Sequence, residues 1–62
     1  MKNYEYHKNL TRYYLDDYFI DRWKIEDEKF IFELWHKLPQ HNAVFLEYLS
    51  ENEFINLMED QK

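Results

Sequence analysis

The chain contains no glycine and only one proline, Pro39, among its 62 residues. Glycine is the residue that most easily adopts the left-handed backbone conformation, which hairpin turns and many helix ends require. A chain without glycine is better suited to helices joined by short connections than to a many-stranded sheet. The sequence therefore predicts an all-α fold, in which residues 1–62 form a single small domain of three to four helices.

Residues 27–38 show the clearest helical pattern. Their apolar side chains recur at i, i+3, i+4 and i+7, as on one face of an amphipathic helix: Ile31, Leu34, Trp35 and Leu38. Acidic residues at 26–28 suit the positive end of a helix dipole, and Pro39 disfavours helical geometry in the residue before it. We therefore expect a helix that ends at Pro39.

Residues 9–24 predict another helix, one that is apolar on nearly all sides. The competing interpretation is a β-hairpin that turns at Asp16-Asp17, because the many aromatic residues here also suit strands. Asp-Asp is a poor substitute for the usual Asn-Gly or Asp-Gly turn, so we favour the helix. No glycine or proline separates this segment from residues 27–38, which leaves open whether residues 9–38 form one long helix or two.

Capping signals divide the C-terminal part of the chain. Asn42 suits the N-cap of a helix over residues 43–49. Ser50 and Glu53 match a capping box that would begin a last short helix, with Phe54, Leu57 and Met58 facing inward. At the other end, residues 1–8 alternate weakly, which fits a short strand, an extended arm or a frayed terminus.

Little in the sequence supports catalysis, a cofactor or a metal. The chain has no cysteine and no glycine-rich loop for a phosphate. Glu33 and His36 would share one helical face, but that face lies opposite the apolar stripe and is expected to be solvated. We expect a protein that is not an enzyme.

Nucleic acid and membranes are also disfavoured as partners. A small basic patch with aromatic neighbours exists near the N-terminus: Lys2, Lys8 and Arg12 with Tyr4, Tyr6 and Tyr13. The net charge of −5, and the absence of Lys or Arg from Leu38 to Gln61, oppose binding to phosphates. No apolar run approaches the roughly 20 residues that span a membrane, and the N-terminus lacks the apolar core of a signal peptide. We expect a cytoplasmic protein.

The positive signal is a surplus of aromatic residues beside acidic ones. Thirteen of the 62 residues are Phe, Tyr or Trp, more than so small a core is expected to enclose. Tyrosine and tryptophan are enriched at protein interfaces, and acidic rims steer binding towards basic partners. We therefore predict a small inhibitor or regulator that occupies a basic, nucleic-acid-binding surface of another protein. Its predicted partner-binding residues are Tyr14, Asp16, Asp17, Tyr18 and Asp21, followed by Glu47, Tyr48 and Glu51.

Two further observations bear on this hypothesis. The small, acidic composition rich in Lys, Asn and Tyr is typical of phage or mobile-element proteins of bacteria. Residues 4–11, Tyr4-Glu-Tyr-His-Lys-Asn-Leu-Thr11, are similar to a short stretch of a small acidic phage inhibitor of uracil-DNA glycosylase. The similarity covers these eight residues only, and no functional residue is carried over from it.

The alternative hypothesis is a structural homodimer. In that case the surplus aromatic residues would form the interface between two copies of the chain, and their exposure in a single copy would have no further purpose.

Overall fold

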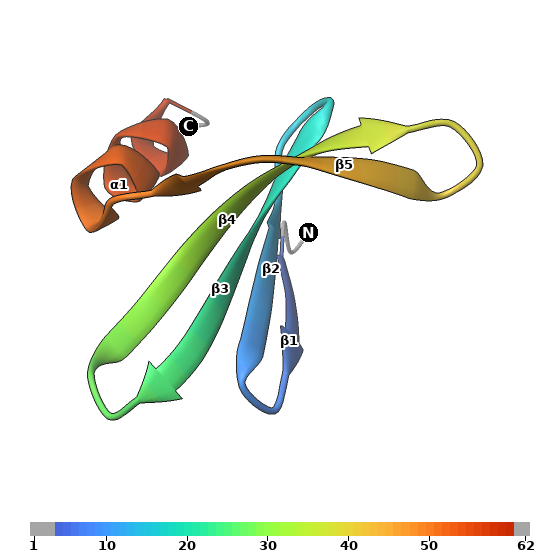
Figure 1. Cartoon of the computed structure of the whole chain (residues 1–62). Helices are drawn as coiled ribbons and strands as arrows, with labels where there is room; N and C mark the ends of the chain where they lie inside the picture. Colours follow the sequence, from blue (N-terminus) through green and yellow to red (C-terminus); the bar gives the residue numbers. More distant parts are fainter. Residues whose placement is uncertain (1–3, 61–62) are drawn as a thin grey trace.

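The computed structural model describes residues 4–60, and for Glu5 and Tyr6 it describes only the backbone. Five strands form one antiparallel sheet in chain order, and a single helix follows them (Figure 1). The elements are β1 (Tyr4–His7), β2 (Leu10–Tyr14), β3 (Tyr18–Glu26), β4 (Lys29–Leu38), β5 (Asn42–Leu49) and α1 (Glu51–Glu59). The predicted all-α bundle of three to four helices is therefore wrong.

The predicted helix over residues 27–38 is instead the strand β4. In a strand, side chains two or four residues apart share a face. Leu34 and Leu38 consequently lie on one face of the sheet, and Ile31 and Trp35 lie on the other. The spacing resembled one helical stripe because apolar residues occur on both faces of the strand.

The segment predicted as a helix over residues 9–24 is the hairpin of β2 and β3, so the competing hairpin interpretation is correct. Its loop is Leu15–Asp17, where the Leu15 N–H donates to the Tyr18 carbonyl at 2.9 Å. The predicted helix over residues 43–49 is also wrong. Asn42 is the first residue of β5 rather than a helix N-cap.

The turns form without glycine because other residues adopt the left-handed conformation. Glu28 (φ 63°) does so between β3 and β4, and Gln40 (φ 63°) and His41 (φ 62°) do so between β4 and β5. Two successive left-handed residues, with the Asn42 N–H donating to the Pro39 carbonyl at 3.4 Å, are typical of a type I′ turn. The left-handed conformation costs roughly 1–2 kcal/mol per non-glycine residue. The absence of glycine therefore disfavours these turns without preventing them, and the sheet tolerates the cost.

The predicted capping box at Ser50 is confirmed. The Glu53 N–H donates to the Ser50 hydroxyl at 3.2 Å, and the Ser50 N–H donates to the Glu53 carboxylate at 2.9 Å. These local hydrogen bonds satisfy two backbone donors at the start of α1. Residues 4–7 of the N-terminal segment form a strand, while residues 1–3 lie outside the described residues.

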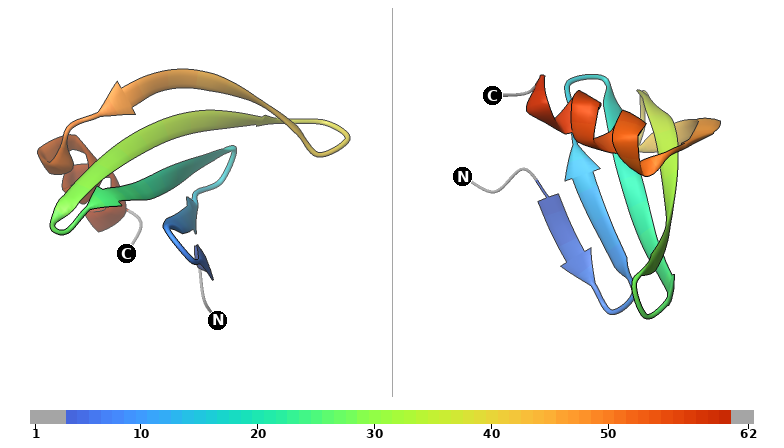
Figure 2. Two further views of the ribbon diagram at one scale, coloured as in Figure 1. Left: turned by 60° about the horizontal axis from the view of Figure 1, so that its bottom comes forward. Right: turned by 90° about the vertical axis from the view of Figure 1, so that its left-hand side faces the viewer.

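The core lies between α1 and one face of the sheet, which we call the helix-side face. Ile20, Phe32 and Leu49 are buried there, and Phe54, Leu57 and Met58 of α1 pack against them, as the sequence predicted. The Phe54 ring lies 4.5 Å from the Phe32 ring and 5.0 Å from the Tyr13 ring, measured between centroids. Figure 2 shows α1 lying beneath the curved strands β4 and β5. In residues 4–60 no helix is long and apolar enough to cross a membrane.

Candidate functional site

The opposite face of the sheet, which we call the helix-free face, carries a continuous series of aromatic rings. Because paired residues on adjacent strands point to the same face, the register of β2 to β5 brings these rings side by side. The series, which we call the aromatic row, consists of Tyr14, Phe19, Trp35, Phe45 and Tyr48. Successive ring centroids lie 6.4, 5.9, 5.6 and 4.9 Å apart, and the rings of Phe19 and Trp35 are nearly parallel, at 8°.

Several large apolar side chains of this face are exposed. Tyr48 is 64% exposed and Trp23 is 40% exposed, and Ile31 and Phe45 are exposed as well. No other element of the described residues packs over them, because α1 lies on the opposite face. A contiguous exposed apolar surface on so small a domain indicates an interaction surface.

A buried ion pair lies beside the aromatic row. The Arg12 guanidinium donates from Nε and Nη2 to the two oxygens of Asp21, at 2.7 and 2.9 Å. It also lies 4.1 Å from the centroid of the Phe19 ring. Hydrogen bonding to Asp21 raises the pKa of Arg12, against the lowering effect of partial burial. Asp21 is only 3% exposed, so this predicted partner-binding carboxylate is used within the fold.

The other residues of the first predicted group lie around the β2–β3 loop. Asp16 and Asp17 are exposed in this loop, where the Lys37 N–H donates to the Asp17 carbonyl at 2.8 Å. Tyr14 is half-buried in the aromatic row. Tyr18 is exposed but lies on the helix-side face, with its ring centroid 5.0 Å from that of His36.

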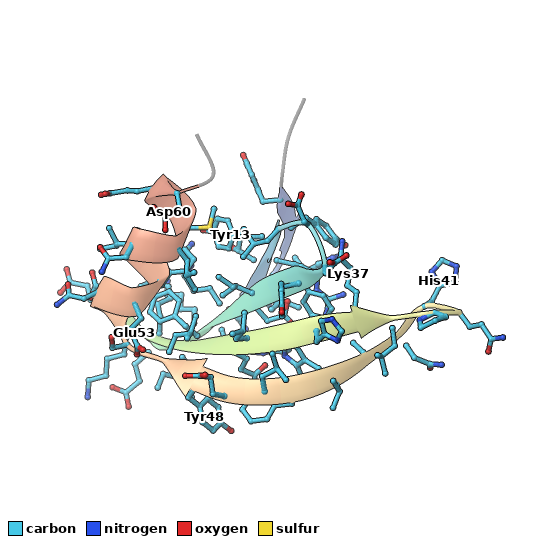
Figure 3. All side chains as sticks on the ribbon, turned by 90° about the horizontal axis from the view of Figure 1, so that it is seen from above. Tyr13, Lys37, His41, Tyr48, Glu53 and Asp60 are labelled. Atoms are coloured by element: carbon cyan, nitrogen blue, oxygen red, sulfur yellow. The ribbon has the colours of Figure 1, made fainter. Side chains whose placement is uncertain are left out.

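The second predicted group, Glu47, Tyr48 and Glu51, is exposed where β5 meets α1, and Glu47 pairs with Leu34 of the helix-side face. Figure 3 shows Tyr48 projecting from β5 on the side away from α1. Glu33 is the register partner of Tyr48 and accepts a hydrogen bond from the Trp23 indole N–H at 2.8 Å. We call this set, Glu33, Phe45, Glu47, Tyr48 and Glu51, the acidic corner.

The acidic corner lies apart from the loop acids and contains no cation. Ala43 of β5 pairs with Lys37, whose N–H donates to the carbonyl of Asp17. Glu47 lies four residues beyond Ala43 along β5, which is roughly 13 Å from Ala43 at the rise of a strand. Lys29 lines one hollow together with Glu51, but its ammonium is paired with Glu26 at 3.4 Å. The two predicted groups are thus separate surfaces.

A groove of about 540 Å³ lies at the other end of the aromatic row. Tyr14, Phe19 and Trp35 line it together with Arg12 and Lys37, and the Lys37 ammonium lies 5.6 Å from the Tyr14 ring centroid. The Trp35 indole N–H is buried and has no hydrogen-bond partner in the described part of the chain. The groove therefore combines three aromatic rings with two cations and this unpaired hydrogen-bond donor.

The predicted partner-binding residues omit Phe19, Trp35 and Phe45, because the helical interpretation places these rings on different predicted helical segments. Counting alternate residues, as in a strand, would have grouped Phe19 with Asp21 and Trp23, and Trp35 with Ile31 and Glu33.

Neither a metal centre nor a known relative provides a further guide to this site. Among residues 4–60, no group of three or more His, Asp or Glu side chains could hold a metal ion. A scan of protein-family models and searches of curated proteins and of solved structures found no match to this chain. Its function is therefore argued from the chemistry of its surface.

Proposed function

We propose that this protein is not an enzyme and acts by binding another protein through the acidic corner, where β5 meets α1. The observation that carries the proposal is the exposure of Tyr48, which is 64% exposed and lies close in sequence to the exposed carboxylates of Glu47 and Glu51. An exposed ring flanked by uncompensated acids suits a partner that offers an apolar pocket with a basic rim.

The proposed partner surface is one that normally binds nucleic acid. Such surfaces combine cations for phosphates with sites where bases stack. In this proposal the carboxylates of Glu33, Glu47 and Glu51 take the place of phosphates, and the rings of Phe45 and Tyr48 take the place of bases. The protein would then act as an inhibitor or regulator of its partner.

The proposal is tested by reversing charge at the acidic corner. Affinity capture from the native host would identify partners, whose binding to the purified chain is then measured as the salt concentration rises. Glu47→Lys combined with Glu51→Lys should weaken binding at least tenfold at low salt, because two attractive charges become repulsive. Tyr48→Ala should weaken it by a similar factor, since it removes a central ring.

The matched control is Asp16→Lys with Asp17→Lys, which changes the net charge equally but at the separate β2–β3 loop. We expect this variant to bind within about threefold of the original chain. Equal losses in both double variants would show that only net charge matters, and affinity independent of ionic strength would rule out the electrostatic proposal. An oligonucleotide that fails to displace the partner would rule out a nucleic-acid-binding surface as the target.

A second candidate function, a structural homodimer, is favoured by the outer edge of β5. This strand is last in the sheet and pairs only with β4 among the described strands. Val44, Phe45 and Leu46 are exposed along it. An apolar edge strand without lysine or proline is prone to pair with a second chain.

A further inference from the structure

A second hollow, distinct from the acidic corner, opens on the helix-side face near the β1–β2 turn. It has a volume of about 290 Å³ and is lined by Lys8, Asn9, Thr11, Arg22, Lys24 and Phe30. We call it the cationic hollow. The hydrogen bond from the Lys24 N–H to the Asn9 carbonyl, at 2.8 Å, holds the turn against β3.

Every charged residue that lines the cationic hollow is positive, although the chain as a whole carries a net charge of −5. Lys24 is paired only with the fully exposed Asp27, at 3.7 Å, and such a contact is weak in water. Among the described residues, no carboxylate lies within ion-pair distance of Lys8 or Arg22. Within the described part of the chain, Lys8 and Arg22 therefore have no carboxylate partner, and Lys24 has only the weak contact with Asp27.

Arg22 is held in place and is only partly satisfied. Its guanidinium carbon lies 4.6 Å from the centroid of the Phe30 ring and 5.8 Å from that of Tyr13. Its Nε is buried and has no hydrogen-bond partner in the described part of the chain. A half-buried cation with an unmet donor is unfavourable unless an anion supplies the missing acceptor.

We propose that the cationic hollow binds the phosphate group of a small phosphorylated molecule. A phosphate offers several charged acceptor oxygens to the guanidinium, the two ammonium groups and the Asn9 amide around the hollow. The acidic remainder of the chain repels a long polyanion, which favours a single phosphate over a nucleic acid. The hollow is separate from the acidic corner, so this inference does not depend on the proposed partner.

The first test compares thermal unfolding in phosphate, glycerol phosphate and acetate with unfolding in chloride at the same pH and ionic strength. A ligand that binds only the folded chain raises its melting temperature. Phosphate and glycerol phosphate should raise it more than acetate. Phosphate also stabilises proteins non-specifically, so the comparison needs variants. Lys8→Gln should lose most of the additional rise in melting temperature that phosphate and glycerol phosphate cause. Lys29→Gln, which removes an equal charge outside the hollow, should retain that rise.

The second test is an NMR titration of the full chain with glycerol phosphate. We expect saturable shifts at the amides of residues 8–11 and 22–24, and roughly tenfold weaker affinity in Lys8→Gln, a loss equivalent to about 1.4 kcal/mol. Arg22→Gln should abolish saturation. Lys8 lies in an exposed turn, so the Lys8→Gln substitution leaves the fold intact. Shifts that spread over all lysines and arginines, or equal weakening by Lys29→Gln, would overturn the proposal. Tighter binding of an oligonucleotide than of glycerol phosphate would overturn the choice of a small ligand.

Discussion

Arg12 and Asp21 are unequal partners in the ion pair beneath the aromatic row. The Asp21 side chain is 4% exposed, whereas the Arg12 side chain is 34% exposed and can reach water. Removing one partner of a buried pair leaves the other charge uncompensated, and the penalty depends on how deeply that remaining charge is buried. The raised pKa of Arg12 means that its stabilising contribution is fully present at neutral pH, well below the ordinary pKa of arginine. It is lost only as the pH rises past the higher folded value.

We therefore predict that Arg12→Met destabilises the fold more than Asp21→Asn. Arg12→Met leaves a buried carboxylate and should lower the free energy of unfolding by about 3 kcal/mol. Asp21→Asn leaves a guanidinium that water can reach and should lower it by about 1 kcal/mol. Urea denaturation followed by circular dichroism measures both values. Equal losses in the two variants would contradict the asymmetry inferred from burial.

At the scale of secondary structure, the sequence correctly predicted the feature that depends only on residues close together in the chain. The capping box needs only Ser50 and Glu53, three residues apart, and it formed as predicted. Whether the β4 segment forms a helix or a strand depends instead on the adjacent segments, because Ile31 and Trp35 fit a helical stripe and a strand face equally well. Only the pairing with β3 and β5 decides between them, and that pairing depends on residues outside β4 itself. The same register assembles the aromatic row, so sequence reasoning found Tyr14 and Tyr48 but missed the rings between them.

The β4–β5 turn offers a test of how glycine-free hairpins are tolerated. Gln40→Asn with His41→Gly should raise the free energy of unfolding by about 1 kcal/mol, because Asn-Gly adopts two successive left-handed conformations with less strain. Chemical denaturation of the purified variant measures the gain. Glycine placed instead at the exposed helical position Asn52 should lower stability by up to about 1 kcal/mol. A loss of stability in the turn variant would mean that Gln40 and His41 are not strained there.

For the whole molecule, net charge separates the two candidate functions. Two copies that each carry −5 repel one another at long range, whereas an acidic chain and a basic partner attract. The Debye length falls from about 30 Å at 0.01 M salt to about 3 Å at 1 M, so salt removes both effects. Pairing between two copies through the apolar edge of β5 should therefore strengthen with salt, while binding to a basic partner should weaken.

We predict a monomer at low salt that associates as salt is raised, measured by sedimentation equilibrium at 0.01 M and 1 M sodium chloride. The exposed side chains Val44 and Leu46 lie on the edge strand β5, so Val44→Lys should suppress the association by placing a desolvated charge in the contact. Lys8→Gln, far from β5, should leave the association unchanged. A tight dimer already present at low salt, and abolished by Val44→Lys, would mean that contacts between copies outweigh the charge repulsion. The exposed rings of β5 would then belong to a homodimer interface, and the proposal of a basic partner at the acidic corner would fail.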